Sequence, residues 1–178
     1  MVASGFHART GQPHRHAGQA QASEWHTGRV ADIDRRALAV LDQLLGAELV
    51  RALRYRGYAV VARGWASVAV AAEFRRLADE KTAYAERIAE RIVRLGSTPD
   101  FSPVGLLVHG QADEPVPTTL DDMLRAGLVA ERAAADTCRR LARLVEGRER
   151  DTWRLLQDIL AAQEEHAEAL SDWLAQRT

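Results

Sequence analysis

Four long stretches of the chain place apolar residues three and four positions apart, and this spacing most constrains the fold. Such intervals put the apolar side chains on one face of an α-helix. Alanine, leucine, arginine and glutamate dominate after residue 30, and these residues favour helices. We predict an all-α fold with four helices at about 32–63, 67–95, 118–147 and 150–176.

Residues 96–118 separate the second predicted helix from the third and contain four of the five prolines and three glycines. A connection of this length can carry the chain from one end of a helix pair to the other. We expect Val104–Val108 to pack against the helices on the way. The predicted architecture is an antiparallel four-helix bundle with one long crossover between helices two and three.

Residues 1–30 show no periodicity, contain four histidines and have no acidic residue before Glu24. We interpret them as a flexible, mildly basic N-terminal arm in front of a bundle domain at 31–178. The arm has two interpretations. It is either a solvated tail without a function, or a segment that binds metal weakly or contacts DNA phosphates.

The overall composition excludes several classes of protein. With 178 residues, 47% hydrophobic and 28% charged, the chain suits one folded domain. The net charge of −1 shows no overall excess of basic residues, so it does not indicate binding of nucleic acid by the chain as a whole. The single Cys138 excludes a disulfide framework and fits a reducing compartment. No apolar run approaches the roughly 18 residues of a membrane span, and no apolar signal core is present, so we expect a cytoplasmic protein.

Polar residues interrupt the apolar face of every predicted helix near its middle. A polar side chain in a core loses stability unless it is hydrogen-bonded or binds a ligand. In a bundle with one crossover, these positions can meet at one level of the core. The interrupting residues are Glu48, Lys81, Tyr84, Glu131, Gln163 and His166.

Four segments of the chain resemble bacterioferritins. They are GAELVRALRYRGY (46–58), AERIAERIVRLGSTPDFSP (85–103), LDDMLRAGLVAER (120–132) and ILAAQEEHAEAL (159–170). Their order and spacing extend the resemblance over about residues 35–175. The chain is more similar to the short branch without a fifth helix, called mini-bacterioferritin or Dps-like. The resemblance implies a ferritin-like bundle that assembles into a hollow shell, a dodecamer in this branch. It also implies iron oxidation at a di-iron ferroxidase centre and iron storage.

The resemblance assigns metal ligands to three positions: Glu48 on the first helix, Glu131 on the third and His166 on the fourth. Tyr55 matches a tyrosine close to the centre. The family's haem-ligating methionine falls at Thr82, so we expect no haem.

Three positions of the implied centre depart from the family pattern. Lys81 and Tyr84 occupy the places of glutamate and histidine in the Glu-x-x-His motif of the second helix, and Gln163 replaces a glutamate of the fourth. Both bridging carboxylates are thereby replaced. A protonated lysine donates hydrogen bonds but cannot ligate a metal, so we expect the ferroxidase activity to be impaired or absent.

Three interpretations of the centre remain open. It is an intact di-iron centre, a mononuclear Zn(II) or Fe(II) site formed by Glu48, Glu131 and His166, or a metal-free cluster. In the last, which we favour, Lys81 bridges Glu48 and Glu131 while Tyr84, Gln163 and His166 complete its hydrogen bonds. Substitution of the missing ligands by Glu80 or Glu164 would need a distorted helical turn.

Three functions are compatible with these sequence features. The first is a shell subunit for iron storage or detoxification that handles Fe(II) and Fe(III), as a homo-oligomer or together with an active paralogue. The alternative is a Dps-like, non-enzymatic protective shell that binds DNA through its N-terminal arm. The third is a helical interaction module with neither shell nor metal.

Overall fold

The computed structural model describes residues 17–65, 67–109 and 117–177. These residues form helices and no strand, as predicted. The helices are α1 Ala17–Gly64, α2 Val68–Arg94, α3 Pro103–His109, α4 Leu120–Val145 and α5 Arg150–Ala175.

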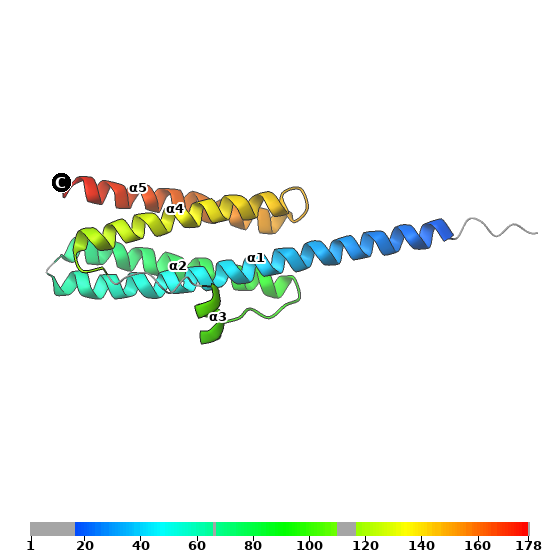
Figure 1. The fold of residues 1–178 in the computed structure, drawn as a ribbon, viewed down its shortest axis with the longest axis horizontal. Coiled ribbons are helices and arrows are strands. Elements are labelled where there is room, and N and C mark those ends of the chain that lie inside the picture. Colours follow the sequence, from blue (N-terminus) through cyan, green and yellow to red (C-terminus); the bar gives the residue numbers. More distant parts are fainter. Residues whose placement is uncertain (1–16, 66, 110–116, 178) are drawn as a thin grey trace, which may run out of the picture.

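The four long helices form two antiparallel hairpins, α1 with α2 and α4 with α5 (Figure 1). The chain leaves α2 at one end of the bundle and begins α4 at the opposite end, so the segment between them is the predicted crossover. Contacts of α1 with α4 and of α2 with α5 join the two hairpins. The predicted four-helix bundle with one long crossover is therefore confirmed.

The start of the first helix was predicted wrongly. Helix α1 begins at Ala17, not near Asp32 or Asp34, whereas the flexibility of the arm over residues 1–30 stays a prediction. The prediction relied on apolar periodicity, which reports a buried face rather than helicity itself. The N-terminal part of α1 extends past the ends of the other described helices, and none of these lies beside it there (Figure 1). Residues 1–16 lie outside the described range, so metal or DNA binding by the arm stays a prediction.

Part of the crossover is helical rather than irregular. Pro103 opens the short helix α3, a position where its missing N–H costs nothing. The Ser102 Oγ accepts a hydrogen bond from the Gly105 backbone N–H at 3.0 Å. Helix α3 contacts α1. Gly105 is buried, but Val104 is 69% exposed, so the predicted packing of this segment is wrong at Val104.

The ends of the helices follow local capping chemistry. Gly96, with φ +80°, follows the end of α2, and Gly147, with φ +70°, lies in the turn between α4 and α5. Both conformations are in the left-handed region that favours glycine. At the start of α4, the Thr119 side chain accepts a hydrogen bond from the Asp122 backbone N–H at 3.0 Å.

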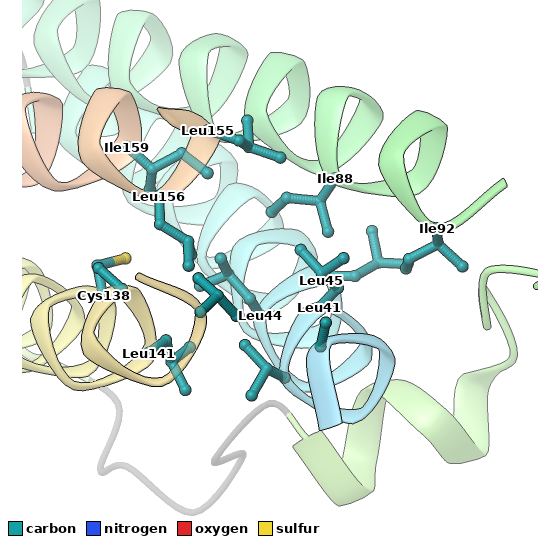
Figure 2. Close-up of a cluster of buried hydrophobic side chains, with 14 of the residues drawn as sticks. Leu41, Leu44, Leu45, Ile88, Ile92, Cys138, Leu141, Leu155, Leu156 and Ile159 are labelled. Carbon is teal, nitrogen blue, oxygen red and sulfur yellow. The ribbon is translucent and has the colours of Figure 1, made fainter. Parts of the chain in front are cut away.

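The bundle interior consists of two apolar clusters. One is drawn in Figure 2, where Leu41, Leu45, Ile88, Leu141 and Leu156 converge from four helices. The other contains Tyr55, Phe74, Leu77, Met123 and Leu170, among further residues. On every long helix, the residues between the two clusters include buried polar side chains. These side chains form a polar layer that separates the two halves of the core. The layer consists of Glu48, Lys81, Glu131, Gln163 and His166.

None of the described helices is both long enough and apolar enough to cross a membrane.

Replacement of Thr119 by alanine should lower the free energy of unfolding by about 1 kcal/mol, because the Asp122 N–H loses its capping acceptor. Urea denaturation followed by circular dichroism measures this change. Thr118→Ala is the matched control, since the Thr118 hydroxyl makes no contact with that N–H among the described hydrogen bonds. Equal losses in the two variants would contradict the capping role.

Candidate functional site

The predicted centre is a cluster of buried polar side chains in the middle of the bundle. Glu48, Lys81, Glu131 and Gln163 are fully buried, and His166 is 2% exposed. They come from α1, α2, α4 and α5. The structure thus brings together five of the six positions that the sequence singled out. The sixth, Tyr84, is only half-buried.

Lys81 lies at the middle of the cluster, and its ammonium group has three acceptors. Its Nζ donates to Glu131 Oε2 at 2.6 Å and to Gln163 Oε1 at 2.5 Å, and lies 3.1 Å from His166 Nδ1. An ammonium carries three N–H bonds and accepts none. Each N–H therefore has a partner, which a buried charge requires.

Glu131 is held by groups from two other helices. The Tyr55 hydroxyl donates to Glu131 Oε1 at 2.6 Å, and Lys81 occupies the other oxygen. Burial by itself raises the pKa of this carboxyl, but His166, Lys81 and Arg51 more than offset burial and lower it to about 2. Glu131 is therefore an anion at neutral pH. Burial and the Glu131 charge raise the pKa of Tyr55 well above its usual value, so its hydroxyl remains a donor.

Glu48 contacts Lys81 only through Gln163. The Gln163 Nε2 donates to Glu48 Oε1 at 2.9 Å, while Gln163 Oε1 accepts from Lys81. The positive partner of Glu48 is Arg51, whose Nη2 lies 2.5 Å from Oε1. The predicted direct bridge from Lys81 to both glutamates is thus replaced by two ion pairs that Gln163 joins. Glu48 Oε2 and Arg51 Nε are buried without a partner among the described residues.

Arg51 is the residue of this cluster that the sequence pattern did not single out. Its side chain is 12% exposed. Burial lowers the pKa of this guanidinium, but the carboxylates of Glu48 and Glu131 outweigh burial and raise it. The available signal was position, because Arg51 is three residues after Glu48 and side chains with this spacing meet on a helix.

His166 connects the cluster to the surface. Its Nε2 lies 2.5 Å from Glu80 Oε2, and Glu80 Oε1 accepts from Arg76 at 2.5 Å. In the tautomer of His166 that accepts from Lys81 at Nδ1, the proton is on Nε2 and points toward Glu80. Glu80 was expected to reach the centre only through a distorted turn. It contacts His166 from within the uninterrupted helix α2, with 36% of its side chain exposed.

Tyr84 does not take the place predicted for it. Among the described hydrogen bonds, none joins Tyr84 to the cluster. Its ring instead packs against the first apolar cluster and lies under the Arg87 guanidinium, 5.8 Å from the ring centroid. Burial raises the pKa of its hydroxyl, and so does the charge of Glu80.

The charges of the centre balance without a metal. Lys81 and Arg51 supply two cations, and Glu131 and Glu48 supply two carboxylates. A di-iron centre needs bridging carboxylates to offset its metal charges, whereas here an ammonium and an amide occupy those positions. The ammonium nitrogen lies within hydrogen-bond distance of Glu131 and near His166, where it would repel a metal cation. The donor set therefore does not fit a di-iron centre.

A mononuclear site also meets an obstacle in this geometry. The predicted ligands Glu131 and His166 lie 3.4 Å apart, but Gln163 and Arg51 occupy Glu48 Oε1. Over the part of the chain that the structure describes, no three His, Cys, Asp or Glu side chains are grouped to hold a metal ion. Metal binding by Glu48, Glu131 and His166 therefore stays a prediction.

Cys138 is a buried free thiol on α4, where it packs in the first apolar cluster (Figure 2). Burial raises its pKa to about 12, and the Glu48 charge adds to the shift. Such a thiol is protonated and unreactive at neutral pH.

The fold and centre together define a four-helix bundle protein with a polar site built from all four long helices. Residues 38–178 match the family model described as the ferritin-like domain. The chain belongs to the ferritin-like family, in its bacterioferritin-related branch. A similar solved structure is that of a dodecameric thioferritin, the bacterioferritin-related protein from Bacteroides fragilis. It shares 25% sequence identity and a TM-score of 0.75, over 84% of this chain and 94% of that chain.

Replacement of Lys81 by methionine should lower the free energy of unfolding by about 3–5 kcal/mol, because Glu131 loses its buried cation. Urea denaturation measures the loss. A second replacement, Glu131→Leu, removes the stranded carboxylate and should recover part of the stability. A Lys81→Met chain within about 0.5 kcal/mol of the native one would contradict this account.

The stability should also depend on pH through Glu131. Its folded pKa of about 2 is below the ordinary value of 4.5, so its contribution is complete above pH 4.5 and is lost as the pH falls toward 2. This contribution is on the order of 3 kcal/mol. Denaturation midpoints measured across this range should fall more steeply for the native chain than for Glu131→Gln. Parallel profiles would exclude the effect.

Proposed function

We propose that this chain is a shell subunit for iron storage or detoxification in which a metal-free ionic cluster replaces the ferroxidase centre. Membership of the ferritin-like family supports the iron function and the bundle. The observation that carries the proposed change of chemistry is the Lys81 ammonium, with an acceptor for each of its three N–H bonds inside a fully buried site.

In this proposal two cationic side chains balance the carboxylate charges that two metal ions would otherwise balance. Lys81 neutralises Glu131, and Arg51 neutralises Glu48. Gln163 fits a centre with these two cations better than a glutamate would, because its single amide group accepts from Lys81 and donates to Glu48. A second glutamate could only accept, and it would add an unbalanced charge to the core.

Such a subunit contributes structure rather than catalysis to a shell. The similar thioferritin is described as dodecameric, and we propose a dodecamer for this chain as well. Iron is then cargo, which reaches the interior as Fe(II) and is stored as Fe(III). Dioxygen would accept the electrons of Fe(II), slowly where the iron binds to surface carboxylates, or rapidly where an active paralogue joins the same shell.

The proposal is tested by anaerobic loading with Fe(II) followed by oxygen, with absorbance and oxygen consumption recorded. The native chain should show no rapid phase. The variant Lys81→Glu, Tyr84→His, Gln163→Glu restores the family ligands, but Arg51 still occupies Glu48. A fourth change, Arg51→Leu, frees that carboxylate, so the fourfold variant should oxidise Fe(II) faster than the threefold one.

The matched control adds Arg56→Leu to the threefold variant in place of Arg51→Leu, because Arg56 is an exposed arginine on the same helix. Rapid oxidation of about two Fe(II) per subunit by the native chain would overturn the proposed loss of the centre, since that is the capacity of a di-iron site. A monomer that retains no iron after loading would overturn the shell function.

A further inference from the structure

Lys81 is the only lysine in the sequence, whose other strongly basic residues are all arginines. A lysine amine forms amides with activated acyl groups, whereas an arginine guanidinium stays charged and does not react in this way. Because Lys81 is fully buried, the single ε-amine of the chain lies inside the core. Lysine-directed acylation therefore has one target in this chain, and folding covers that target.

The folded bundle keeps acyl donors away from the amine of Lys81. Its nitrogen lies within 3.1 Å of side-chain atoms of Glu131 on α4 and of Gln163 and His166 on α5. His166, which links the cluster to the part-exposed Glu80, is itself only 2% exposed. A reagent therefore reaches the amine only when α4 and α5 separate from α2, which is a local or global opening of the bundle.

An acyl group on Lys81 would prevent the polar layer from closing again. The amide product has one N–H and no charge, in place of three N–H bonds and a positive charge. Gln163 and His166 would then compete with Glu131 for a single donor. Glu131 would keep the Tyr55 hydroxyl as a donor but would lose the cation bonded to it. Removal of one partner from a buried ion pair is strongly destabilising, and the added acyl atoms would also overfill the core.

We propose that Lys81 is an acylation site that marks opened chains: acyl phosphates or acyl thioesters modify it only after the bundle opens, and the modified chain does not close its polar layer again. In the reaction the neutral amine nitrogen bonds to the acyl carbon, and the phosphate or thiolate leaves. The amine gives up one proton, which the leaving group or solvent takes, so no oxidant or reductant is needed. The inference goes beyond the iron function and does not depend on it.

The first test compares Lys81 with an exposed lysine in the same molecule. The variant Arg125→Lys supplies this internal control, because the Arg125 side chain is 60% exposed on α4. The full chain is treated with acetyl phosphate in one arm and with an acetyl thioester in the other, and peptide mass mapping gives the rate at each position. In the folded chain residue 125 should react at least about a hundredfold faster than Lys81. In guanidinium chloride that unfolds the chain, the two rates should converge, and the arm that labels Lys81 identifies the donor.

Two results of this first test would overturn the inference. One is acetylation of Lys81 in the folded chain at a rate comparable to that of residue 125, since the bundle would then offer no protection. The other is a Lys81 that stays unmodified in the unfolded chain while residue 125 reacts.

The second test asks whether the modified chain folds. The Arg125→Lys variant is acetylated partially in guanidinium chloride, returned to native buffer and separated into folded and unfolded fractions by size-exclusion chromatography. Acetylated Lys81 should be at least about tenfold depleted from the folded fraction, because Glu131 has lost its bonded cation. Acetylated residue 125 should occur equally in both fractions. An even distribution of acetylated Lys81 would overturn the inference and would leave the proposed iron function untouched.

Discussion

The buried ion pair between Lys81 and Glu131 is the interaction on which the middle of the bundle depends. Two charges in a core are stable only when each is paired and fully hydrogen-bonded. Here α5 supplies Gln163 and His166 to the ammonium, and α1 supplies Tyr55 to the carboxylate. All four long helices must therefore be in register before the pair is satisfied, so the polar layer specifies one alignment of the two hairpins.

Apolar periodicity explains which parts of the fold could be predicted from the sequence. Leu41, Leu45, Ile88 and Leu156 recur with helical spacing and are buried, so periodicity alone located the bundle. The start of α1 at Ala17 was missed because residues 17–30 show no apolar periodicity, and periodicity was the signal that located the helices. The short helix α3 was missed for a related reason, since seven residues are too few for a pattern and proline suggested irregular backbone.

The residues that form the centre could be predicted from the sequence, but the hydrogen bonds that join them could not. Spacing showed that Glu48, Lys81, Glu131, Gln163 and His166 would meet, and they do. It could not show that Gln163 would lie between Lys81 and Glu48, because the reach of side chains across helices depends on packing. Arg51 escaped notice since arginine is usually exposed, and a cation beside a buried glutamate is recognisable only after the glutamate is known to be buried.

With lysine and glutamine in place of the bridging carboxylates that the family resemblance implies, the charge of the core is neutralised at a different stage. A carboxylate-rich centre carries uncompensated negative charge until a metal binds, and this repulsion opposes folding. In this chain the cations Lys81 and Arg51 belong to the helices themselves. The charges of Glu131 and Glu48 are therefore neutralised as the chain folds. The same two cations raise the electrostatic cost of any metal entering beside Glu131 or Glu48. In the proposed metal-free centre, folding without a metal and the loss of a metal site would both follow from this one arrangement of charges.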